Sequence, residues 1–143
     1  MIRRLLLAAV LAASTVSVVS ATSNVVEERE GLFKAMGREA RPVGAMLKGE
    51  APLDLPKVQA TLDLIIKNAQ ALPAMFPAGS QADSDALPTV WERNDEFKAL
   101  FVKLGEEAAK ARVAITDDAS LKANFPSVIR ACGTCHQTFR KKS

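Results

Sequence analysis

The chain has 143 residues, which suits a single domain, and its formal net charge at pH 7 is only +3. Arg3 and Arg4 supply two of these three net charges, so residues 22–143 carry a formal charge of +1. A charge this small gives no indication of the basic surface that nucleic-acid binding requires.

The first 21 residues have the three parts of a secretory signal peptide. Arg3 and Arg4 make a positive start, residues 5–13 are apolar, and small residues lead up to Ala21. The alternative is a membrane anchor, but an apolar stretch of about 15 residues is short for a span. We therefore predict cleavage after Ala21. The mature protein, residues 22–143, is then periplasmic and free of the membrane.

Helical periodicity dominates the rest of the chain, because apolar residues recur at spacings of three and four and no stretch alternates with period two. The first helix is expected over residues 25–48. Asn24 and Glu27 resemble a capping box at its start, Gly49 is a natural stop, and Pro42 should bend it.

Three further helices follow. The second is expected to start after Asp54, with Pro56 in its first turn, and residues 73–87 form a loop. The third is expected as one helix that starts near Pro88, and its stripe is continued by Val90, Asn94, Phe97, Phe101 and Leu104. The fourth should begin at Asp117 or Asp118 and continue almost to the end. Four amphipathic helices joined by short or moderate loops predict an all-α four-helix bundle.

The chemistry of the chain lies in a C-x-x-C-H sequence, Cys132-Gly133-Thr134-Cys135-His136. Two thiols one helical turn apart can add to the two vinyl groups on one edge of a porphyrin. The imidazole that follows is then held over the iron as an axial ligand, and its other ring nitrogen should find a hydrogen-bond acceptor. Both cysteines continue the apolar stripe of the fourth helix, so the haem would enter the bundle: Leu121, Phe125, Val128, Cys132, Cys135 and Phe139.

Three other uses of these residues fit the sequence less well. A disulfide between Cys132 and Cys135, beside an ordinary core histidine, would close a tiny loop and stabilise the fold very little. A zinc site needs about four ligands, and His136 is the one histidine of the chain. A thioredoxin-like motif belongs at the start of a helix after a strand, and the sequence predicts no strand. We therefore predict one haem c, attached through Cys132 and Cys135 and ligated by His136.

The chain resembles the class II c-type cytochromes, specifically the cytochrome c′ family. Beside the haem motif, the resemblance rests on several short segments in a fixed order: Arg29-Glu30-Gly31-Leu32-Phe33, Gly37-Arg38, Lys48-Gly49-Glu50-Ala51-Pro52, Asp85-Ala86-Leu87-Pro88-Thr89-Val90-Trp91 and Gln137-Thr138-Phe139-Arg140. It covers all of residues 22–143. The family implies an antiparallel four-helix bundle that encloses a covalently bound haem.

The resemblance also implies roles for individual residues. Arg29 matches an arginine near the haem propionates, and Glu30 beside it lines the haem. Asp85 matches a loop residue at the haem edge, although ordinary surface charges remain the alternative for Arg29 and Asp85. Arg140 matches a basic residue on the proximal side, and its spacing of four from His136 places both on one helix face.

Function in this family depends on the sixth coordination position of the iron. Family members with Met at the distal position are low-spin electron carriers of the cytochrome c556 type, whereas an apolar residue leaves the iron five-coordinate and high-spin. The resemblance assigns this position to Phe33, which has no lone pair to donate. Met36, one turn further on, is the competing ligand, while Met46 and Met75 are less suited, and methionines on helices are more often core filler.

We therefore expect a five-coordinate haem protein that binds nitric oxide and carbon monoxide and can transfer one electron. Dioxygen should bind poorly, because it gains stabilisation from a distal hydrogen-bond donor. The alternative is a dedicated, Met-ligated electron carrier with an unidentified redox partner protein. No enzymatic activity is expected. The resemblance further implies a homodimer through the first two helices, where Ala40 and Ala45 would allow close approach.

Overall fold

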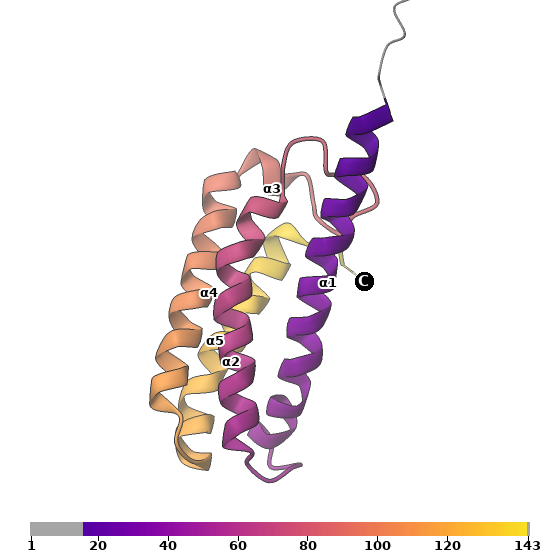
Figure 1. The fold of residues 1–143 in the computed structure, drawn as a ribbon. Helices are drawn as coiled ribbons and strands as arrows, with labels where there is room; N and C mark the ends of the chain where they lie inside the picture. The colour runs from indigo at the N-terminus through magenta and orange to yellow at the C-terminus, as the bar shows by residue number, and fades with distance from the viewer. Residues whose placement is uncertain (1–15, 143) are drawn as a thin grey trace, which may run out of the picture.

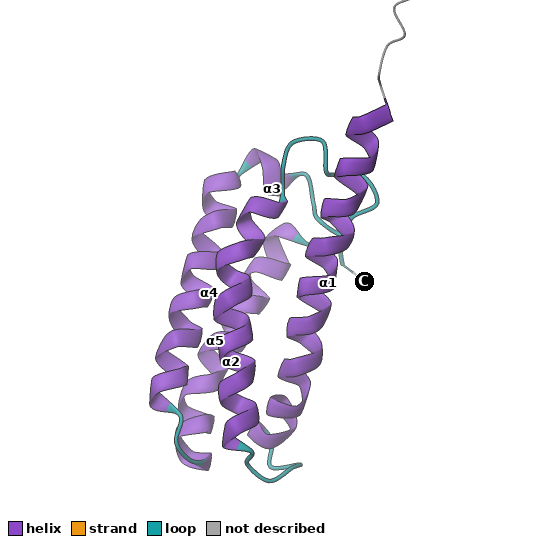
Figure 2. Cartoon of the chain, in the orientation of Figure 1, coloured by secondary structure: helices purple, strands orange, loops and turns teal. Residues whose placement is uncertain are grey.

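A computed structural model describes residues 16–142, and these residues form an all-α protein (Figure 2). The four long helices lie side by side, and consecutive ones run in opposite directions (Figure 1). The fold is therefore the predicted antiparallel four-helix bundle. Its helices, in chain order, are α1 (Val16–Leu47), α2 (Leu55–Ala71), the 3-10 helix η1 (Leu72–Met75), α3 (Thr89–Glu92), α4 (Asn94–Ala114) and α5 (Asp118–Phe139).

Helix α1 is longer at its N-terminus than the sequence predicts. It is already helical at Val16, so Asn24 lies inside it and the predicted capping-box start is wrong for the full-length chain. The physical reason is that residues 16–23 contain neither Gly nor Pro, and nothing there breaks the helix. The predicted signal peptide falls mostly on residues 1–15, which lie outside the described residues, and its cleavage site at Ala21 lies within α1.

The turn between α1 and α2 follows the sequence prediction. Gly49 adopts a φ of 77°, a left-handed conformation that favours glycine, and its N–H donates to the Met46 carbonyl at 2.9 Å. The Asp54 side chain then accepts a hydrogen bond from the Lys57 N–H at 2.9 Å and caps α2. The first residues of the expected loop form η1, so the irregular segment covers residues 76–88.

The expected third helix is divided in two, so the prediction of one continuous helix is wrong. Arg93 leaves the helical conformation, with φ −118° and ψ 46°, and separates α3 from α4. Local side chains support this break. The Asn94 amide donates to the Val90 carbonyl at 3.2 Å, and Asp95 and Glu96 place negative charge at the new helix start.

Helix α5 begins where the sequence predicts. Asp117 and Ser120 form a reciprocal capping box: the Ser120 N–H donates to the Asp117 carboxylate at 2.8 Å, and the Asp117 N–H donates to the Ser120 hydroxyl at 2.9 Å. The hydrogen bonds from Ser120 hold the pKa of Asp117 below its ordinary value. The helix continues through Pro126 and carries the C-x-x-C-H sequence in its last two turns.

The two ends of the bundle differ in composition. We call the end that carries residues 76–88 the loop end, and the opposite end, with the turns at 48–54 and 115–117, the hairpin end. Six aromatic rings in mutual contact fill the loop end: Phe33, Phe76, Trp91, Phe97, Phe101 and Phe139. Aliphatic side chains fill the hairpin end, among them Val43, Met46, Val58, Ala108, Ala111, Ile115 and Leu121.

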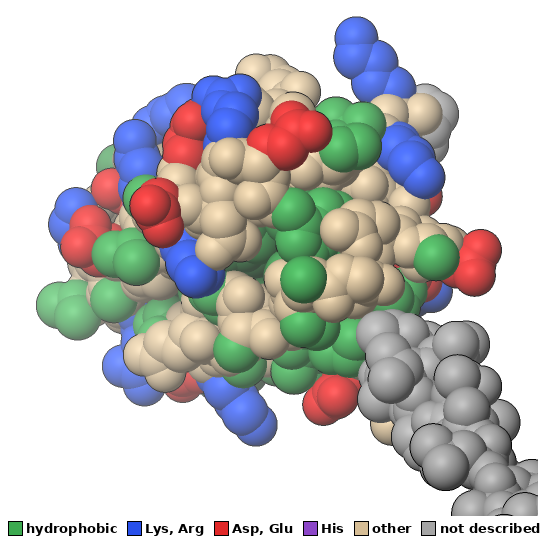
Figure 3. Space-filling model, turned by 90° about the horizontal axis from the view of Figure 1, so that it is seen from above, with side chains coloured by type: hydrophobic (Ala, Val, Ile, Leu, Met, Phe, Trp, Pro, Cys, Tyr) green, Lys and Arg blue, Asp and Glu red, His purple; other side chains and the backbone are tan. Residues whose placement is uncertain are grey.

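Figure 3 views the loop end from above. Apolar side chains are visible near the centre of this face, and charged side chains surround them. Within the described part of the chain, no helix combines the length and the apolar character that crossing a membrane would require.

Candidate haem site

The two cysteines lie one turn apart on α5, and both are half-buried against the core. Both are free thiols, so the disulfide alternative is not what the structure shows. Burial raises the pKa of Cys132. Burial is also the main cause that raises the pKa of Cys135 to about 11, and the negative charge of a Cys132 thiolate is the smaller cause. Both thiols are therefore protonated at neutral pH.

The imidazole of His136 follows directly and is exposed. The surrounding protein still desolvates the ring enough to lower its pKa, and the positive charge of Arg140 lowers it further. The ring is therefore neutral at pH 7 and keeps a lone pair for a metal. No described residue accepts a hydrogen bond from this imidazole, so the expected acceptor for its second nitrogen is not found among residues 16–142.

This donor set fits a haem and does not fit a four-coordinate metal ion. Among residues 16–142 there is no group of three or more His, Cys, Asp or Glu side chains arranged to hold a metal. Two protonated thiols one turn apart, beside one accessible imidazole, are the groups that covalent attachment and axial ligation of a haem use. The apolar stripe predicted for α5 is confirmed, since Leu121, Phe125, Val128 and Phe139 are all buried.

Phe33 lies half-buried on α1, within the aromatic cluster. Its ring centroid is 6.5 Å from that of Phe76 and 6.2 Å from that of Phe101. Met36, one turn further along α1, is buried in the core, as is Met46. Both methionines therefore occupy positions typical of core filler.

Arg29 is the most buried charged residue described, with 1% of its surface exposed. Its guanidinium donates to the Met75 carbonyl, to the hydroxyl and carbonyl of Ser80, and to the hydroxyl of Ser84, at 2.7–3.0 Å. The alternative that Arg29 is an ordinary surface charge is therefore wrong. Glu30 points elsewhere and pairs with Lys34 at 3.1 Å.

The structure brings Asp85 and Arg140 together at the exposed surface. Their side chains approach to 3.7 Å, and the backbone of Ala86 forms an antiparallel bridge with Arg140. The Leu87 N–H donates to the Phe139 carbonyl and the Lys141 N–H to the Asp85 carbonyl, at 2.9 and 2.8 Å. These contacts fasten the loop to the end of α5, one turn beyond His136.

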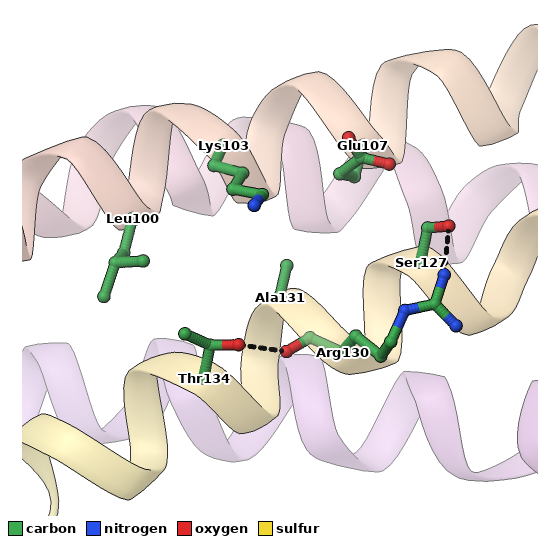
Figure 4. Close-up of a pocket in the computed structure, with 7 residues that line it drawn as sticks. All are labelled: Leu100, Lys103, Glu107, Ser127, Arg130, Ala131 and Thr134. Carbon is green, nitrogen blue, oxygen red and sulfur yellow. Dashed lines mark hydrogen bonds between the residues drawn. The ribbon is translucent and has the colours of Figure 1, made fainter.

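Sequence reasoning missed two features of this half of the bundle. One is Phe76, which follows η1 in a proline-rich segment where no periodicity marks a buried residue. The other is a cleft of about 350 Å³ between α4 and α5, which adjoins the motif through Thr134 (Figure 4). Its lining alternates charged, polar and apolar side chains, so neither helix carries a recognisable pattern for it: Leu100, Lys103, Glu107, Ser127, Arg130, Ala131 and Thr134.

Comparison with known proteins gives a consistent result. Residues 24–140 match the family model described as Cytochrome C'. A cytochrome c' from Rhodopseudomonas palustris is 44% identical over 124 residues, which cover 85% of each chain. A solved structure of cytochrome c' from Rhodopseudomonas palustris covers 83% of this chain and 97% of its own, with a TM-score of 0.81 and 44% identity.

Two further matches bear on the chemistry. A cytochrome c-556 from Agrobacterium fabrum is 42% identical over 118 residues, which cover 82% of this chain and 81% of that protein. A variant of cytochrome c prime from Alcaligenes xylosoxidans, solved as its nitric oxide complex, has a TM-score of 0.75 and 25% identity, covering 85% of this chain and 97% of that one.

Proposed function

The chain belongs to the cytochrome c′ family, whose members carry haem c, and on that premise we propose a periplasmic protein with five-coordinate, high-spin iron that binds nitric oxide and carbon monoxide and exchanges single electrons. Cys132 and Cys135 would hold the haem as thioethers, and His136 would ligate its iron. The bound haem supplies a metal centre that takes diatomic ligands and changes oxidation state by one electron.

The observation that carries the proposal is Phe33 at the expected distal position. Phenylalanine cannot ligate iron, and His136 is the one histidine in the sequence, so neither Phe33 nor a second histidine supplies a sixth ligand; the low-spin members of the family use a methionine. Met36 and Met46 both pack in the core. The Met36 side chain would have to leave the core for its sulfur to reach an iron, and the stabilisation that comes from its burial would then be lost.

Selectivity among gases follows from the same apolar surroundings. Phe33 is flanked by Phe76 and Phe101, which offer no hydrogen-bond donor to a bound ligand. Nitric oxide and carbon monoxide need none, whereas dioxygen depends on one for much of its stabilisation. The nitric oxide complex of the Alcaligenes xylosoxidans relative supports this chemistry within the family.

The same surroundings argue against catalysis. Peroxidase-like turnover would need a polar acid or base close to Phe33. Arg29 donates its hydrogen bonds to the loop, and Glu30 is paired with Lys34. We therefore propose a binding and electron-transfer protein rather than an enzyme, with a redox partner protein and a homodimer through α1 and α2 as further parts of the proposal.

The second candidate function is a low-spin electron carrier, and the 42% identity to cytochrome c-556 favours it. The two functions differ in one measurable property, the spin state of the iron. In this alternative Met36 is the sixth ligand, so replacing Met36 would convert the protein to high spin, while replacing Phe33 would leave it low-spin.

The test is the optical spectrum of the purified holoprotein, oxidised, reduced and treated with nitric oxide or carbon monoxide. We expect high-spin bands in the wild type and in Met36→Leu, formation of both gas adducts, and a shift toward low spin in Phe33→Met. Phe33→Leu is the matched control and should stay high-spin. If the wild type is low-spin and does not bind nitric oxide, and if Met36→Leu is high-spin, the protein is the low-spin electron carrier instead.

A further inference from the structure

A buried cation fixes the segment that follows η1. Arg29 projects from α1, and the hydrogen bonds of its two terminal nitrogens go to Met75, Ser80 and Ser84. Desolvation lowers the pKa of Arg29, while the negative charge of Glu30 raises it. Burying a guanidinium is costly unless its N–H groups are paired, and here the loop itself supplies the acceptors.

The same guanidinium also lies against the aromatic cluster. Its central carbon is 4.3 Å from the centroid of the Phe76 ring and 5.9 Å from that of the Trp91 ring. A cation over an aromatic face at this distance is attracted by the ring quadrupole, and more strongly when both are removed from water. Phe76 is therefore held both by the backbone next to Met75 and by direct contact with Arg29.

Phe76 in turn contacts Phe33. Arg29 and Phe33 are one turn apart on α1, so the two side chains lie on the same face of the helix and both touch the Phe76 ring. Phe97 meets Phe76 edge-on at 4.7 Å and closes the cluster behind it. The Phe33 ring can therefore move toward Phe76 only if Phe76 moves as well.

We propose that Arg29 is a positioning residue that holds Phe76 against Phe33 and thereby sets the rate at which a gas reaches the iron. The inference rests on the proposed function, in which Phe33 covers the distal position. Arg29 itself touches neither the ligand nor the iron in this scheme. It acts through the rotation of two aromatic rings.

Lysine is the informative replacement for Arg29. It keeps the positive charge, but its single nitrogen cannot reach the acceptors that the two terminal nitrogens of the guanidinium serve together, and it lacks the flat surface that lies on Phe76. In Arg29→Lys the reduced holoprotein should therefore bind carbon monoxide faster, by about fivefold, as expected for the loss of one cation–π contact. The dissociation rate should change much less, because it is governed mainly by the iron–ligand bond.

Two further variants make the measurement specific. Arg38→Lys is the matched control, since Arg38 lies on α1 with an exposed side chain, and its association rate should equal that of the wild type. Phe33→Ala removes the proposed barrier. Adding Arg29→Lys to Phe33→Ala should then leave the association rate unchanged, because no ring remains for Phe76 to hold. Equal acceleration in both backgrounds would overturn the proposal.

A second readout separates positioning from loop anchoring alone. Asp83 and Asp85 are exposed, so an Asp-specific endoproteinase reports on loop opening in the holoprotein. We expect Arg29→Lys to be cleaved faster than Arg38→Lys. Faster cleavage with an unchanged association rate would reduce Arg29 to a loop anchor and overturn the inference alone. A wild type that takes up no carbon monoxide would overturn the proposed function, and the inference with it.

Discussion

The loop end and the hairpin end of the bundle are built by different means. The hairpin end is held by aliphatic packing, by a glycine turn, by two helix caps whose partners are three residues apart, and by the Gln59 amide, which donates to the Arg112 and Ile115 carbonyls. The loop end is held by aromatic contacts and by hydrogen bonds whose partners are separated by 46 to 57 positions in the sequence. The candidate haem residues lie toward the loop end. Stability and ligand chemistry are therefore expected to respond to changes at different ends.

The largest expected effect tests the motif near the loop end. The double variant Cys132→Ala, Cys135→Ala removes both sulfurs that would hold the haem, so acidified organic solvent should extract the haem, whereas either single variant keeps one thioether and should retain it. Thr134→Ala lies between the cysteines on the exposed face and is the matched control, with haem retention as in the wild type. Full retention of haem in a Cys132→Ala, Cys135→Ala double variant would contradict covalent attachment.

A core truncation at the hairpin end should affect stability alone. Leu121 is fully buried, so Leu121→Ala should lower the free energy of unfolding by about 3 kcal/mol. Val113→Ala serves as the control, because Val113 is 81% exposed and lies near the same end. The spectrum and the carbon monoxide kinetics of folded Leu121→Ala should match those of the wild type. A changed spin state would mean that the two ends are coupled.

The cap of α5 should give the hairpin end a specific acid sensitivity. Hydrogen bonds from Ser120 lower the pKa of Asp117 in the folded state. The ionised Asp117 carboxylate therefore stabilises the folded protein fully at pH values above the unfolded-state pKa of this group, and this stabilisation is lost as the pH falls through the folded-state pKa. Asp117→Asn keeps a capping oxygen but does not titrate there. Urea unfolding at several pH values should show the wild type losing its advantage over this variant between about pH 5 and pH 2. A constant difference would exclude this linkage.

The smallest effect is expected at the exposed ion pair that joins the loop to α5. Asp85 and Arg140 are 3.7 Å apart with 71% and 46% of their side-chain surfaces exposed. Such pairs contribute little, so Arg140→Gln should cost less than about 0.5 kcal/mol in urea unfolding at low salt. The backbone bonds of Leu87 and Lys141 would keep the loop in place. A loss several times larger would show that the ion pair is the main attachment.

The difference between the two ends also explains what the sequence could predict. Asp54, Asp117 and Gly49 act on backbone groups within a few residues, so their effects are visible in the sequence and the structure confirms them. The C-x-x-C-H motif is local in the same sense. The break at Arg93 was missed, because the apolar spacing continues across it from Val90 to Phe97 and hides the change of conformation.

The contacts of the loop end were missed for a different reason. Nothing next to Arg29 in the sequence indicates that Ser80 and Ser84 will receive its hydrogen bonds, because these partners meet only after the bundle has formed. Phe76 follows η1 in a proline-rich segment, where no periodic apolar pattern marks a buried residue. Family resemblance identified Arg29 and Phe33 as important, but the ring that joins them had to come from the structure.

The protonated state of the two thiols affects the protein before haem is attached. Disulfide formation proceeds through the thiolate, and at pH 7 a group with a pKa of about 11 is ionised only about once in ten thousand molecules. In an oxidising compartment a raised thiol pKa would slow premature cross-linking of Cys132 and Cys135. Partial burial on a finished helix would therefore extend the time during which both sulfurs stay competent for cofactor loading.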